Sequence, residues 1–152
     1  MTSSIQIMTR FMPRAFRLRP EERRLALEAL ATLAAARLVL ALLPFPEAMR
    51  HLGLRVGQAD PKLSAAPGIG DAVAAAVRRA SRVVPFRAVC LQQAVAAALM
   101  LRRRGQQVEV YFGVAREETG GLGAHAWTMC GEFPVTGGEQ RPGFTTIAVF
   151  VA

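Results

Sequence analysis

Cys90 and His125 are the two residues of this sequence whose types and surroundings suit covalent catalysis. Cys90 is predicted to begin a helix, where unpaired backbone N–H groups and the helix dipole stabilise a thiolate. His125 follows a glycine turn at the head of a predicted strand. If the helix packs on that strand, the imidazole can take the thiol proton and later protonate a leaving amine. Spacing alone does not decide the matter, because a Cys in an apolar helix usually packs as a small hydrophobic residue.

The remaining Cys and His are expected to be structural. Strand alternation places His125 and Trp127 on one face and Cys130 on the other, so Cys130 is predicted to pack in the core. Two cysteines exclude a disulfide scaffold and a zinc site made of Cys alone. His51 has no neighbouring ligands and is interpreted as a surface helix residue. We therefore predict no metal.

The second half of the chain must supply the elements that position Cys90 and His125. A helix is predicted from about Val89 to Arg104, ending at Gly105. Period-2 alternation then predicts a strand over Val108–Val114. Two further strands are predicted at Ala124–Cys130 and Phe144–Val151, which gives one helix followed by an antiparallel meander.

The first half is predicted to be helical. A long helix is expected from Pro20 to Leu43, with proline at a favourable first position. A short helix is expected over Glu47–Leu52, an exposed connection from Gly57 to Gly70, and a third helix over about Asp71–Arg82. The predicted fold class is α+β, with a helical N-terminal half and one Cys-bearing helix packed on a small antiparallel sheet.

Composition limits the classes of function. A length of 152 residues suits one domain, and 52% hydrophobic with 20% charged residues argues against disorder. The net charge is +8 and Lys62 is the only lysine, so an Arg-rich surface should attract anions. The run Arg102–Arg104 is nevertheless expected to be a solvated helix end, since few aromatics accompany it; no nucleic acid is predicted. The glycine pairs match no dinucleotide or phosphate loop, so no cofactor is predicted.

The apolar stretch from Leu25 to Leu43 has about the length of a membrane span. It contains Glu28 and Arg37, and a charge near a bilayer centre costs about 3 kcal/mol. A buried amphipathic helix is therefore predicted, with no transmembrane span. Residues Met1–Arg19 carry no recognisable export signal, and with free cysteines the expected location is the cytoplasm.

Several motifs taken together resemble the lasso peptide biosynthesis B proteins. The motifs are ERRLALEALATLAAARLVLALLPF (22–45), SRVVPFRAVCLQQAVAAALMLRRRG (81–105), VEVYFGVA (108–115), AHAW (124–127) and FTTIAVF (144–150). The spacing of the motifs taken together is more specific than any one of them.

The resemblance implies a transglutaminase-like cysteine peptidase that removes the leader from a ribosomally made precursor. It implies a papain/transglutaminase-like core and a single peptidase domain over residues 1–152, with a helical subdomain over about 1–83 and the catalytic part over about 84–152. The family's nucleophile corresponds to Cys90 and its general base to His125. The chain is similar to the split form of the family, which lacks a fused leader-binding domain.

The family's third catalytic residue, an Asp about a dozen residues after the His, is not matched. Position 137 is Gly, and no Asp follows Asp71. The imidazole could be oriented by Glu139, our first choice, by Glu132, by a backbone carbonyl, or by nothing. Gln93 and Trp127 are expected near the substrate pocket, and the Cys90 N–H is the simplest oxyanion donor.

The implied partners are a lasso precursor peptide, a separate RiPP recognition element protein and an ATP-dependent lasso cyclase. The alternative hypothesis is a catalytically degenerate scaffold that binds the precursor and the recognition protein without cleaving.

Overall fold

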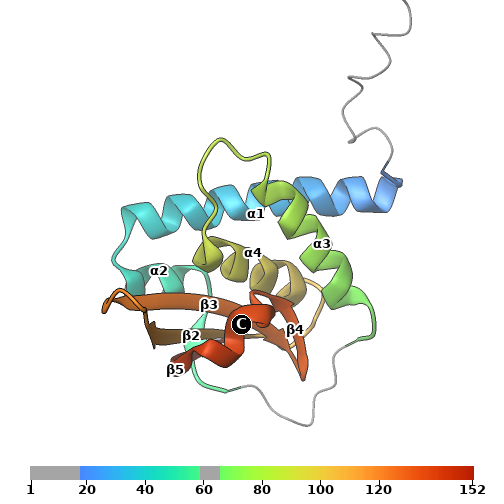
Figure 1. Cartoon of the computed structure of the whole chain (residues 1–152). Helices are drawn as coiled ribbons and strands as arrows, with labels where there is room; N and C mark the ends of the chain where they lie inside the picture. Colours follow the sequence, from blue (N-terminus) through green and yellow to red (C-terminus); the bar gives the residue numbers. More distant parts are fainter. Residues whose placement is uncertain (1–17, 59–65) are drawn as a thin grey trace, which may run out of the picture.

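A five-stranded antiparallel sheet carries one central helix on one face (Figure 1). The computed structural model describes residues 18–58 and 66–152. The strand order is β1-β5-β2-β3-β4, and all four pairings are antiparallel. The strands are β1 (Arg55–Val56), β2 (Glu109–Arg116), β3 (Leu122–Cys130), β4 (Phe133–Thr136) and β5 (Thr145–Val151).

The helices lie close to the predicted ranges, and they confirm the α+β class with its helical N-terminal part. Their ends follow local rules. Pro20 begins the first helix, and the Glu22 carboxylate accepts the Arg19 N–H at 3.0 Å. Gly105 ends the Cys-bearing helix region with a φ of 70°. The helices are α1 (Pro20–Leu42), α2 (Phe45–His51), α3 (Ile69–Ser81), α4 (Cys90–Arg102) and the 3-10 helix η3 (Gly138–Gly143).

Helix α4 is the centre of the molecule. It lies between the sheet and the outer pair α1 and α3 (Figure 1). Every residue from Ala94 to Leu101 is buried, and these small and aliphatic side chains let both layers approach closely. A single hydrophobic cluster joins α1, α3, α4 and the sheet. The start of α4, where Cys90 sits, is thus fixed relative to the strands by packing along the rest of the helix.

The sheet corrects the predicted meander. The last strand, β5, pairs with β2 rather than with β3, and the short strand β4 occupies the other side of β3. Strand β4 was not predicted, because it has only four residues and contains Pro134, and prolines in strands are tolerated only at sheet edges. The two-residue β1 was not predicted either. Strand order depends on which distant segments pair, and this is not encoded in local alternation.

Helix α1 is less buried than predicted. It packs inward through Ala29, Leu33 and Ala36, whereas Leu38 and Leu42 on its outward side are largely exposed. Within 18–58 and 66–152 it is the one helix long and apolar enough to cross a membrane by length and composition. The same helix forms part of the core cluster.

The arginine run at the end of α4 is largely exposed, and it also makes contacts that the sequence did not predict. Arg104 makes two hydrogen bonds to the Glu28 carboxylate of α1, with Nη1 to Oε1 at 3.1 Å, and Arg103 lies 3.6 Å from the same group. Arg102 Nη1 donates to the carbonyls of Leu52 and Gly53 at 2.9 and 3.0 Å. Arg102 and Arg103 remain exposed, as predicted, whereas Arg104 is partly buried against Glu28. The run also fastens α4 to α1 and to the end of α2.

Two predictions concern residues outside the described ranges. The expected lack of an export signal rests largely on residues 1–17, and the expected connection from Gly57 to Gly70 includes residues 59–65.

Candidate active site

Cys90 is the first residue of α4, as predicted. Val89 precedes it in an extended conformation and donates its N–H to Gln92 Oε1 at 2.7 Å, which closes the helix start. Cys90 itself is partly exposed. The first N–H groups of a helix have no intrahelical acceptor, so the thiol lies where a negative charge is stabilised.

His125 lies in β3 and is nearly buried, with 7% of its surface exposed. Its Nε2 is 2.8 Å from the carbonyl oxygen of Gly137. The ring stacks on Trp127 at a centroid distance of 5.9 Å and lies 5.1 Å from the Phe144 ring. Two aromatic contacts and one hydrogen bond thus hold the imidazole in a single orientation.

Part of the β3 edge on the β4 side, at His125 and Ala126, is not covered by a neighbouring strand among the described residues. Strand β4 pairs with β3 only as far as Thr128↔Thr136, so the edge beside Ala126 and His125 carries no further strand. On the helix side, Thr128 Oγ1 donates to the Ala94 carbonyl of α4 at 2.8 Å. This bond fixes the first turns of α4 against β3, one turn from Cys90 and three residues from His125.

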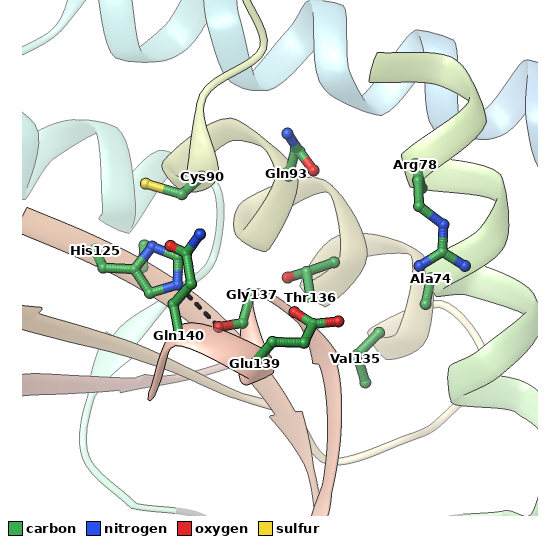
Figure 2. Close-up of a pocket in the computed structure, with 11 residues that line it drawn as sticks. Ala74, Arg78, Cys90, Gln93, His125, Val135, Thr136, Gly137, Glu139 and Gln140 are labelled. Carbon is green, nitrogen blue, oxygen red and sulfur yellow. Dashed lines mark hydrogen bonds between the residues drawn. The ribbon is translucent and has the colours of Figure 1, made fainter. Parts of the chain in front are cut away.

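A cavity of about 270 Å³ opens at this edge, and Cys90 and His125 both line it. Figure 2 shows the Cys90 thiol above the imidazole, with Nε2 directed away from it toward Gly137. The cavity continues between α3 and the segment after β4. Its other lining residues are Ala74, Arg78, Gln93, Ala126, Val135, Thr136, Gly137, Glu139 and Gln140.

Of the other predicted site residues, Gln93 and Glu139 line the cavity and Glu132 does not. Gln93 lines the cavity from α4, and its Nε2 donates to the Ala88 carbonyl at 2.8 Å. Glu139 also lines the cavity, but the group that accepts the hydrogen bond from His125 Nε2 is the Gly137 carbonyl. Glu132 is exposed on the turn between β3 and β4 and is not among the lining residues.

Trp127 does not line the cavity, contrary to the prediction. It is 2% exposed and is sandwiched between His125 and Tyr111, whose ring is parallel to the indole at 5.5 Å. Gly113 makes room for it, because a Cβ there would lie 2.9 Å from the indole ring. Trp127 therefore packs against the imidazole of His125 and does not line the cavity.

Cys130 lies in the hydrophobic core, on the face of β3 that alternation predicts. Burial raises the pKa of its thiol, which makes it a poorer nucleophile. Among the described residues no cluster of three or more His, Cys, Asp or Glu side chains could hold a metal ion. Cys90 is accordingly the thiol suited to chemistry.

Three contributors to the site were not predicted from the sequence. The Gly137 carbonyl has no side-chain signature, although a backbone carbonyl was one of the expected alternatives for orienting the imidazole. Phe144 was predicted only as the start of a strand, and Arg78 only as part of the third helix. The adjacent glycines at positions 137 and 138 mark only a turn in the sequence, and the left-handed φ of 67° at Gly137 is seen in the structure alone.

Such an arrangement can perform covalent acyl chemistry. A thiol at a helix start, an oriented imidazole beside it and backbone N–H groups next to the thiol supply a nucleophile, a base and oxyanion donors. The adjoining cavity can accept a side chain or a short stretch of peptide.

Comparison with known proteins agrees with this chemistry. A profile of the transglutaminase-like superfamily, Transglut_core3, matches residues 25–149. No curated protein and no solved structure matches the chain at a significant level.

Proposed function

The chain belongs to the transglutaminase-like superfamily, and from that premise we propose that it is a cysteine peptidase with Cys90 as nucleophile and His125 as base. The superfamily includes cysteine peptidases. The observation that carries the proposal is that a helix-start thiol and an oriented imidazole line one cavity.

In the proposed reaction the unprotonated His125 Nδ1 takes the thiol proton, and Cys90 Sγ attacks the carbonyl carbon of the scissile bond. The resulting oxyanion is stabilised by N–H groups at the start of α4, including that of Cys90. Collapse of this intermediate breaks the C–N bond, and the imidazolium gives its proton to the leaving amine. Water, deprotonated by the same imidazole, then hydrolyses the thioester and restores the thiol.

We propose the leader of a lasso precursor peptide as the substrate. Support comes from the resemblance of the segments around Cys90, His125 and the last strand to the lasso peptide biosynthesis B proteins. The same resemblance supports a separate recognition element protein that presents the leader, and an ATP-dependent cyclase that receives the released core. We also propose that the reaction takes place in the cytoplasm.

The test mixes the purified chain with the precursor and the recognition protein encoded beside it, and measures product masses. Cys90→Ala is expected to abolish leader removal while the thermal unfolding temperature stays near that of the wild type. Cys130→Ala is the matched control, since it removes the core thiol and is expected to retain cleavage. Undiminished cleavage by Cys90→Ala would refute the assignment.

The competing proposal is a scaffold that binds the precursor complex without cleaving it. The observation in its favour is that Gly stands at position 137 and no Asp follows Asp71. A peptide carrying a thiol-reactive group separates the two. Rapid, selective labelling of Cys90 supports the enzyme, whereas precursor binding with labelling no faster than that of a free thiol supports the scaffold.

A further inference from the structure

Gly137 stands where the resembled family places the Asp that orients its histidine, and it contacts the imidazole through its main chain. Building on the proposed function, we propose that the Gly137 carbonyl takes the place of that Asp and is the positioning group for His125. The site is then a complete Cys–His pair with a backbone acceptor, rather than a triad that has lost a member.

The hydrogen bond determines which ring nitrogen carries the proton. A carbonyl oxygen can only accept, so the 2.8 Å contact requires His125 Nε2 to be the donor. In the neutral ring Nδ1 is then unprotonated, and it lies on the side of the ring that faces Cys90 (Figure 2). This is the tautomer that a base for the Cys90 thiol needs.

The backbone around Gly137 leaves no room for a side chain. Its φ of 67° and ψ of 9° lie in the left-handed region, which favours glycine. A Cβ built there would be 2.8 Å from His125 Nε2 and 2.9 Å from the Ala126 carbonyl oxygen. An Asp at this position would therefore displace the imidazole. The hydrogen bond from His125 to this carbonyl thus depends on position 137 being glycine.

The neighbouring groups leave the ring little freedom to choose another acceptor. Trp127 stacks on the imidazole and the Phe144 ring lies against it, so rotation toward Glu139 would give up both contacts. During the reaction Nε2–H stays on the Gly137 carbonyl. The proton from the thiol enters and leaves at Nδ1, so the imidazolium donates from both nitrogens and no proton passes to Gly137.

The first test is a spectroscopic signature that does not depend on cleavage. Long-range ¹H–¹⁵N spectra of the ¹⁵N-labelled protein distinguish the two neutral tautomers of each imidazole. When the ring is neutral, His125 is expected to carry its proton on Nε2. His51, the other histidine, is exposed at the end of α2 and serves as the internal reference. A neutral ring that carries its proton on Nδ1 and none on Nε2 would overturn the proposal, even if the protein cleaves.

The second test replaces Gly137 by Asp, with Gly143→Ala as the matched control. Gly143 ends the same 3-10 helix, has no positive φ, and a Cβ there would meet nothing within 4 Å. Gly137→Asp is expected to lower the rate of leader removal by about 100-fold, as misplacement of a catalytic group by an ångström does. Gly143→Ala is expected to stay within about twofold of the wild type, as surface changes usually do.

The outcomes separate this proposal from the proposed function. Wild-type or higher activity in Gly137→Asp would show that a carboxylate serves as the orienting group, and would refute the role of the carbonyl. If the wild type cleaves no precursor, the proposed function fails, and the His125 tautomer still decides whether the carbonyl positions the ring. If Gly137→Asp fails to fold, the wild-type tautomer again decides.

Discussion

Thr128 joins the two elements that carry Cys90 and His125, and its replacement by Val gives a quantitative test of how they are held. The side chain is fully buried; its Oγ1 donates to the Ala94 carbonyl at 2.8 Å and accepts from Thr136 Oγ1 at 3.2 Å. Valine is close to threonine in volume, so the change removes the hydroxyl and its two hydrogen bonds without opening a cavity.

The expected loss of stability follows from these two bonds. A typical intramolecular hydrogen bond contributes about 1 kcal/mol net. The Ala94 carbonyl lies inside α4 and keeps its helical bond, and Thr136 is partly exposed and can turn to water. We therefore expect Thr128→Val to lower the free energy of unfolding by about 1–2 kcal/mol, which is roughly 2–8 °C in the unfolding temperature of a chain of this size.

The assay is urea unfolding followed by circular dichroism, with thermal unfolding alongside. Thr145→Val in β5 is the matched control, because Thr145 is exposed and its replacement should change stability by less than about 0.5 kcal/mol. If the Thr128 and Thr145 variants were equally stable, the hydroxyl would not fasten α4 to β3. A labelling rate of Cys90 that changes in Thr128→Val alone would show that the same bond also positions the thiol.

Three further predictions rest on titratable groups. The Arg104 guanidinium holds the pKa of the Glu28 carboxyl below its usual value, so the stabilisation is present above an ordinary glutamate pKa and is lost as the pH falls through the depressed one. Glu28→Gln should therefore cost about 1 kcal/mol at neutral pH, with the difference from wild type shrinking below about pH 4 in urea titrations. Burial and the hydrogen bond to Glu109 raise the pKa of Tyr111, the single tyrosine, to about 12. The absorbance of the phenolate should therefore rise with a midpoint near that pH, and Glu109→Gln should lower the midpoint. Cys130, whose thiol pKa is raised by burial, should react with a thiol reagent only after unfolding.

Much of the fold was predictable because helix and strand signals are local. Pro20 at the start of α1 and Gly105 after α4 mark the helix ends, and the alternation from Val108 to Val114 predicts β2. The short β4 was missed because four residues with a proline carry little signal. The pairing of β5 with β2 was missed because several strand orders satisfy the same hydrophobic pattern.

For the candidate site, the sequence by itself determined the two candidates and their local elements: Cys90 at a helix start and His125 in a strand, since residue type and local element are written in the chain. Only the tertiary structure decided what holds the imidazole and where Trp127 lies. A main-chain carbonyl is present at every residue, so nothing in the sequence distinguishes that of Gly137 until the turn after β4 brings it to 2.8 Å from the ring. Among specific groups, the sequence could name only side chains, such as that of Glu139, as the acceptor for His125. Packing instead places the main-chain carbonyl of Gly137 there.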